Sequence, residues 1–154
     1  MLRKLSLLMM LVVMAGMSAF AQSNQRTLTL EEVKVMAKAA EDRARQDNWN
    51  VVIAIVDGGG HLLFLQRMDG AQIASIEVAQ KKAKAAIFYK RPTKVFEDGL
   101  KAGNQGLMLL PDVIASEGGV PIIHDGQVIG AIGVSGVTSA QDGIIATAGV
   151  DVLQ

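Results

Sequence analysis

Two apolar runs, residues 51–57 and 61–69, joined by three consecutive glycines, constrain the fold of this chain more than any other feature. Glycine reaches positive φ without a Cβ clash, so residues 58–60 suit a tight connection with a β-bulge. The first run is apolar up to Val56, which is typical of a strand covered on both faces. The two runs predict an antiparallel β-hairpin around which the rest of the chain packs.

The second run alternates, and counting by twos divides it into two faces. One face carries His61, Leu63, Leu65, Arg67 and Asp69, and the other carries Leu62, Phe64, Gln66 and Met68. A histidine and an arginine at opposite ends of one face, with leucines between them, are the best candidate wall of a ligand site. Met68, on the other face, is interpreted as a core residue and not as a ligand.

Helices are predicted on both sides of this hairpin. Thr29 and Glu32 have the spacing of a capping box and open a helix that ends near residue 48. A second helix covers about residues 73–90. Pro92 ends it, and Thr93 is expected to cap a short third helix that runs to about residue 100.

The second half of the chain predicts an irregular segment, another hairpin and a last helix. Residues 101–119 are rich in glycine and are expected to form a partly buried excursion with at most one short strand. Asp125 and Gly126 lie between apolar runs, which is a strong hairpin signal for residues 120–134. Thr138 or Ser139 caps a helix that extends to about residue 153.

Hairpins separated by helices indicate an α+β domain, with an antiparallel sheet built from two hairpins and flanked by helices. The pattern predicts that residues 22–154 form one domain. Both hairpins are expected to be covered on both faces, although one small domain has few helices for this purpose. We therefore expect a homo-oligomer in which subunit contacts supply the remaining cover.

The first 21 residues are interpreted as a secretory signal peptide. Arg3 and Lys4 precede an apolar run over residues 5–16, and Ala19 and Ala21 occupy the small-residue positions of a cleavage site before Gln22. The run is too short to span a bilayer, and an uncleaved anchor is the alternative. Because the chain has no cysteine, it cannot be anchored as a lipoprotein through a lipid-modified cysteine. The expected location is periplasmic or secreted, with no stable membrane anchor after cleavage.

Composition excludes several function classes. The chain has 15 basic and 15 acidic residues, so no net charge recruits nucleic acid. The absence of cysteine rules out disulfides, a thioether-linked haem, a cysteine-ligated iron–sulfur cluster and a cysteine nucleophile. No H-E-x-x-H motif occurs, and Ser135 does not have the glycine spacing of a nucleophile elbow. The residues favour binding over catalysis.

Several motifs resemble one known family. Residues 56–63 and 67–71 carry the first of them, followed by Lys82-Ala83 and Arg91-Pro92-Thr93. Residues 118–122, 125–126, 130–136 and 141–142 continue the resemblance. Together they resemble the GlcG/HbpS family, a domain that also forms the C-terminus of PduO-type corrinoid adenosyltransferases, from about residue 28 to residue 153. The resemblance implies a profilin- or PAS-like sheet, assembly into homo-oligomers, and binding of haem or a related tetrapyrrole in some members.

Six residues are the candidate ligand contacts. His61, at the glycine-rich turn, is the candidate metal ligand, with a hairpin-end histidine bonded to backbone or water as the alternative. Arg67 either clamps a carboxylate or forms an ion pair within the hairpin. Lys82 and Arg91 are candidates for haem propionates, or else belong to a solvated helix face. Gly130 and Gly133 either cradle a ligand or permit close helix packing.

The sequence therefore predicts an exported domain that binds a small ligand, with haem or another tetrapyrrole as the first choice, for redox or haem sensing, storage or handling. His124 is interpreted as a surface histidine. The competing hypothesis is a small cofactorless enzyme that acts on an anionic metabolite, such as a 2-hydroxy acid, held by Arg67.

Overall fold

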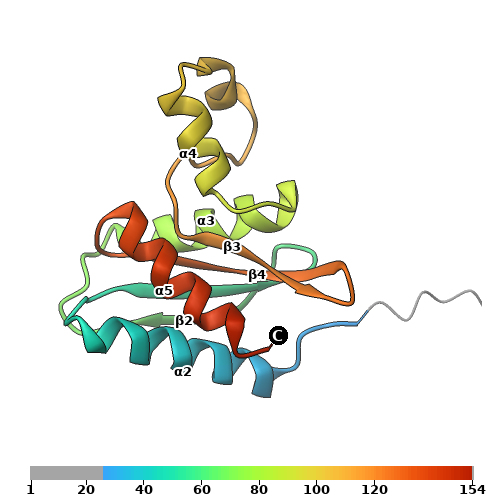
Figure 1. Cartoon of the computed structure of the whole chain (residues 1–154). Helices are drawn as coiled ribbons and strands as arrows, with labels where there is room; N and C mark the ends of the chain where they lie inside the picture. Colours follow the sequence, from blue (N-terminus) through green and yellow to red (C-terminus); the bar gives the residue numbers. More distant parts are fainter. Residues whose placement is uncertain (1–25, 154) are drawn as a thin grey trace, which may run out of the picture.

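A computed structural model describes residues 26–153, and these form a four-stranded antiparallel sheet with helices on both faces (Figure 1). The strands are β1 (Val52–Asp57), β2 (Leu62–Arg67), β3 (Gly119–His124) and β4 (Gln127–Ser135), in the spatial order β2-β1-β4-β3. The predicted α+β class and both predicted hairpins are confirmed. The predicted signal peptide, residues 1–21, lies outside the described residues.

Helices α2 (Leu30–Gln46) and α5 (Ser139–Asp151) pack side by side on one face of the sheet, and α3 (Ser75–Tyr89) covers the other. A short helix, α4 (Lys94–Lys101), and a 3-10 turn, η2 (Gln105–Leu109), project beyond the sheet (Figure 1). Within residues 26–153, no helix has the length and apolar character needed to cross a membrane.

Two of the three predicted helix caps form. The Thr29 hydroxyl accepts a hydrogen bond from the backbone N–H of Glu32, and Thr138 caps α5 in the same way, each within a complete capping box. Each such cap is worth about 1 kcal/mol. The cap predicted at Thr93 is wrong. Its hydroxyl is buried and accepts a hydrogen bond from the N–H of Gly119 at 2.9 Å, so it joins the start of α4 to the start of β3.

A β-bulge changes which residues of β2 share a face. The ladder pairs Leu62 with Val56 and Leu65 with Ala54, and the register shifts between these two pairs. Directly paired residues point to the same side of a sheet, so Leu62 joins Leu65 on the α3 face. The predicted alternation, which placed Leu62 opposite Leu65, is therefore wrong by one residue at the turn end of β2.

The core lies on both faces of the sheet, but β2 is poorly covered. Ile53 and Ile55 of β1 pack under α2 and α5, and Val52, Ala54 and Val56 pack under the small side chains of α3. Within one chain, β2 lacks the full cover that was predicted with the help of subunit contacts, and three of its leucines are exposed: Leu62, Leu63 and Leu65.

The segment between α4 and β3 contains the turn η2 but no strand, so the short strand that the sequence allowed is absent. The segment is partly buried, as predicted: residues 108–112 are exposed, and residues 113–117 are half-buried. Leu109, the extreme case, is 87% exposed. Tyr89 at the end of α3 holds this segment, because its hydroxyl donates a hydrogen bond to the backbone oxygen of Pro111 at 2.6 Å.

A candidate ligand site at the end of the β1–β2 hairpin

The glycine-rich turn between β1 and β2 is organised by the carboxylate of Asp57. Its Oδ1 atom accepts hydrogen bonds from the backbone N–H of Gly59 at 2.8 Å and of His61 at 2.9 Å. Partial burial acts to raise the pKa of Asp57, but the N–H groups of His61 and Gly59 outweigh it and hold that pKa below its ordinary value. The carboxylate is therefore a charged acceptor that closes the turn.

The side chain of His61 stands on the outside of this turn. It is 83% exposed, and its Nδ1 atom lies 3.3 Å from Oδ1 of Asp57. The imidazole also covers Gly59, because a Cβ at Gly59 would lie 2.8 Å from the ring. Since one ring nitrogen faces Asp57, the other, Nε2, is the one open to a ligand.

Two hollows flank the turn. The α3-side hollow, about 260 Å³, is lined by Val56, Gly60, Leu62, Gln80, Lys81 and Lys84. The β4-side hollow, about 350 Å³, is lined by Arg26, Thr27, Asp57, Gly58, Gly59 and Ile129. The imidazole of His61 lies beside the β4-side hollow, because the residues it contacts, Asp57 and Gly59, line that hollow. Only its chain neighbours Gly60 and Leu62 line the α3-side hollow.

The charges in the two hollows differ. In the α3-side hollow, Lys81 lies 3.7 Å from Glu77 and Lys84 lies 3.6 Å from Asp112, and all four side chains are exposed. Such surface pairs are weak, so both ammonium groups are available to a carboxylate ligand. The β4-side hollow contains the Asp57 carboxylate, which repels an anion, and its Arg26 is already hydrogen-bonded to Glu32. An anionic apolar ligand is therefore better matched to the α3-side hollow.

Phe88 of α3 extends the apolar surface next to this hollow. It is half exposed, and the Lys84 ammonium lies 5.3 Å from the centre of its ring. Gly60 has a φ of +82°, and a Cβ there would lie 2.6 Å from the ring of Phe88. Only glycine meets both conditions, so the turn lies directly against α3.

The structure places Arg67 at the opposite end of β2 from His61. Its Nε atom donates a hydrogen bond to the backbone oxygen of Ala71 at 3.0 Å, which fixes the loop after β2. Arg67 and His61 therefore do not converge on one hollow.

Lys82 is buried and points away from both hollows. Its Nζ atom lies 2.8 Å from Oδ2 of Asp142 on α5, with 1% and 3% of the two side chains exposed. The lysine passes the start of β3 at Gly118, where a Cβ would lie 2.9 Å from Nζ. This ion pair joins helices on opposite faces of the sheet, and removing either partner would leave an unpaired buried charge. Burial raises the pKa of Asp142, although the Lys82 ammonium opposes this effect.

The other three candidates also have protein neighbours. Arg91 is exposed, and its Nε donates to the backbone oxygen of Tyr89 at 3.1 Å. A Cβ at Gly130 would lie 2.5 Å from the Leu28 side chain, and one at Gly133 only 2.0 Å from the Ala79 backbone oxygen. Protein atoms, including the backbone of α3, thus fill the space in front of both glycines.

The six candidate contacts chosen from the sequence did not include Asp57, Lys81 or Lys84, which lie at the turn and the α3-side hollow. Lys81 and Lys84 are three residues apart and share one helix face, whereas Lys82 lies on the face of Ala79 and Ala86, which is buried. That spacing could have shown from the sequence that Lys81 and Lys84, and not Lys82, lie on an accessible face of the helix.

His124 is the last residue of β3, at the β3–β4 turn. This turn lies at the same end of the sheet as the β1–β2 turn (Figure 1). Its Nε2 atom, and not Nδ1, faces a carboxylate, 3.3 Å from Oδ2 of Asp125. Its side chain is less exposed than that of His61, at 39%.

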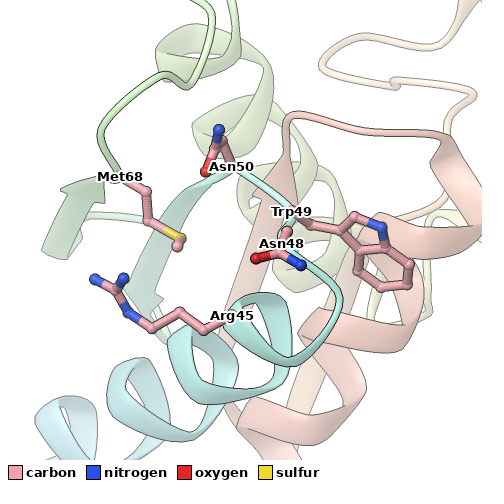
Figure 2. Close-up of a pocket in the computed structure, with 5 residues that line it drawn as sticks. All are labelled: Arg45, Asn48, Trp49, Asn50 and Met68. Carbon is pink, nitrogen blue, oxygen red and sulfur yellow. The ribbon is translucent and has the colours of Figure 1, made fainter.

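A further hollow of about 310 Å³ lies between the end of α2 and the end of β2, lined by Arg45, Asn48, Trp49, Asn50 and Met68 (Figure 2). Two hydrogen bonds tie the Arg45 guanidinium to Glu41. Met68 is buried and belongs to the core. Figure 2 shows that the Trp49 ring is turned away from Arg45 and Met68. This hollow offers polar amides but no imidazole.

Within residues 26–153, no three His, Asp or Glu side chains gather in a cluster that could hold a bare metal ion. A haem iron has a different requirement, because the porphyrin supplies four ligands and the protein supplies only axial donors. The donor set at the turn fits that requirement: one outward imidazole, apolar Val56 and Leu62, and two cations suited to carboxylates.

Comparison with known proteins places these features in a family. The model of the HbpS-like family, described as "Haem degrading protein HbpS-like", matches residues 28–151. Protein GlcG of Escherichia coli strain K12 is 40% identical over 108 residues, which cover 70% of this chain and 81% of GlcG. The crystal structure of HbpS has a TM-score of 0.80 at 33% identity, covering 87% of this chain and 95% of HbpS. The structure of the PduOC:heme complex has a TM-score of 0.75 at 32% identity, covering 82% and 94% of the two chains.

Proposed function

The chain belongs to the HbpS-like family, and from this premise we propose that it binds haem or a related tetrapyrrole at the α3-side hollow, with His61 as the iron ligand. The observation that carries the proposal is the outward His61 imidazole at the same turn as a hollow that combines Val56 and Leu62 with two weakly paired lysines. In support, one structural relative is a haem complex, and the family model is named for haem degradation.

Each part of the site would serve a different part of the ligand. A neutral imidazole is a standard axial donor to haem iron. Lys81 and Lys84 would pair with the propionates, and Leu62 and Phe88 would lie against the edge of the macrocycle. Iron held in this way supplies redox and small-ligand chemistry, which suits a role in haem sensing, storage or handling.

Titration of the purified protein with haemin tests the proposal. We expect a saturable Soret shift in the wild type. His61→Ala should weaken binding by about one to two orders of magnitude, at roughly 1.4 kcal/mol per factor of ten. His124→Ala is the matched control and should leave the titration unchanged. The reverse behaviour of the two histidine variants would move the site to the β3–β4 turn.

The lysines distinguish the two hollows. Lys81→Ala combined with Lys84→Ala should lower haemin affinity, because the propionates lose their partners. Arg26→Ala, on the β4-side hollow, should not. Equal losses in both variants would contradict the assignment to the α3-side hollow.

The competing enzyme hypothesis is tested in the same preparation. A small hydroxy acid bound by Arg67 should stabilise the protein thermally, and Arg67→Ala should abolish that stabilisation. A wild type that shows this effect and gives no Soret shift with haemin would favour the enzyme.

We further propose that the protein is exported and acts as a homo-oligomer. Export rests on the basic, apolar and small-residue pattern of residues 1–21, and assembly on the exposed leucines of β2. Mass spectrometry of periplasmic protein should give a chain that begins at Gln22. A full-length membrane-bound species would contradict export.

A further inference from the structure

The contact between Asp57 and His61 determines which nitrogen of the imidazole carries the proton. Nδ1 lies 3.3 Å from Asp57 Oδ1, an oxygen that already accepts two backbone N–H groups. A hydrogen on Nδ1 is attracted to this carboxylate, whereas a lone pair on Nδ1 would be repelled by it. The neutral ring is therefore favoured in the Nδ1–H form.

We infer that Asp57 is a positioning residue, which holds His61 as the Nδ1–H tautomer and thereby presents the Nε2 lone pair to a ligand iron. This inference rests on the proposed function for its ligand, but the tautomer itself is a property of the free protein. A carboxylate behind an imidazole ligand fixes the ring and strengthens its donor atom.

The turn geometry gives Asp57 two roles that a single substitution can separate. The carboxylate accepts the N–H groups of Gly59 and His61, which shapes the turn, and its charge biases the ring of His61. Asp57→Asn keeps an oxygen acceptor for the turn and removes the charge. Asp57→Ala removes both.

His124 is an internal control for the tautomer of His61, because its other ring nitrogen faces a carboxylate. There the carboxylate of Asp125 faces Nε2 at 3.3 Å, so the same argument favours the Nε2–H tautomer. The two histidines of the chain should thus have opposite tautomers when neutral, and Asp57→Asn should affect only His61.

Long-range ¹H–¹⁵N spectra of the haem-free protein, recorded at a pH where both imidazoles are neutral, test the inference directly. We expect mainly Nδ1–H at His61 and Nε2–H at His124. Asp57→Asn should move the His61 ring nitrogens toward the values of free histidine, in which Nε2–H prevails, while the protein stays folded and the His124 signals stay unchanged. An unchanged His61 tautomer in Asp57→Asn would overturn the inference.

Haemin titration of the same variants gives the second readout. Asp57→Asn should lower affinity by about 10- to 100-fold, the usual effect of losing the group behind a metal-bound histidine. In the His61→Ala background the same substitution should cause no further loss, because Asp57 acts through His61. Equal losses in both backgrounds would show a merely structural role. Failure of the wild type to bind haemin would refute the proposed function, and the tautomer spectra would still decide the role of Asp57.

Discussion

Among the glycines of residues 26–153, Gly133 is the one at which an added Cβ would lie nearest to the backbone of another element. A Cβ on this residue of β4 would lie 2.0 Å from the Ala79 oxygen and 2.5 Å from the Ala83 nitrogen, both in the backbone of α3. Backbone atoms within a helix cannot rotate away as a side chain can. The spacing between α3 and the sheet therefore depends on the absence of a side chain here.

We predict that Gly133→Ala lowers the free energy of unfolding by about 3 kcal/mol, the upper end of the usual cost of overpacking. Urea denaturation followed by circular dichroism measures this change. Gly58→Ala is the control, because a Cβ there would meet its nearest neighbour, the Ile129 oxygen, at an ordinary 3.6 Å. Equal stability of the two variants would mean that α3 can shift away from the sheet at little cost.

For single residues, the sequence could predict features that depend only on neighbouring residues in the chain. Three glycines before His61 placed that residue at a turn, as found. The contact between Asp57 and His61 was not predicted, because it depends on the turn conformation. For Lys82 the sequence left open a ligand contact or a solvated helix face. Its spacing from Ala79 and Ala86 puts it on the buried helix face instead, and its partner Asp142 is 60 residues away in sequence.

At the scale of elements, a buried carboxylate holds α4 to the domain, in addition to the Thr93 hydroxyl. Glu97 accepts hydrogen bonds from the Lys101 ammonium, the backbone N–H of Glu117 and the Ser139 hydroxyl. Burial acts to raise the pKa of Glu97, but the Lys101 bond, the Glu117 N–H and the Ser139 hydroxyl together hold it below its ordinary value. Glu97 thus links α4 both to the loop before β3 and to the first residue of α5.

This lowered pKa predicts a pH dependence of stability. An acid whose pKa is lower in the folded state contributes stability fully above its unfolded pKa, near 4.3 for Glu, and loses it as pH falls through the folded value. We expect Glu97→Gln to be less stable than the wild type by about 1 to 3 kcal/mol at pH 7, the range for hydrogen bonds to a charged group. Thermal unfolding from pH 7 down to pH 3 should show the difference shrinking only below about pH 4.3.

Glu31→Gln is the matched control, because Glu31 lies on the exposed face of α2. Its effect should be small at every pH. A Glu97→Gln deficit that stayed constant down to pH 3 would show that packing, and not charge, is lost.

The order and type of the elements followed from sequence periodicity and turn residues, whereas three element-level details did not. The bulge in β2 depends on the register of two strands, and the buried hydroxyl of Thr93 depends on the position of β3. The irregular segment from 101 to 118 has no periodic pattern. Each requires knowledge of contacts between distant parts of the chain.

At the scale of the whole molecule, β2 is an open edge of the sheet. It is the terminal strand in the order β2-β1-β4-β3, and Leu62, Leu63 and Leu65 are exposed along it. Protective charges are typical of an edge strand in a monomer, and leucines are not. The proposed homo-oligomer would cover this edge.

We predict that light scattering at micromolar concentration gives an assembly larger than a dimer. Leu65→Lys should dissociate it, because a charge on the open edge cannot be buried without a partner. Ile144→Lys, at a similarly exposed apolar residue of α5, is the control and should leave the assembly intact. A wild-type monomer would refute the prediction, and dissociation by both variants would place the contact elsewhere.

The close packing of α3 also fixes the dimensions of the proposed site. One end of the hollow is the β1–β2 turn, which lies against Phe88, and the other is the row of lysines on a helix held by Gly133 and by the Lys82–Asp142 pair. Neither end can move without disturbing the other, so the span from His61 to Lys81 and Lys84 is set before any ligand arrives. If haem binds here as proposed, a hairpin and helix fixed in this way would select ligands by the distance between their central metal and their acidic side groups. Little ordering entropy would then be lost on binding.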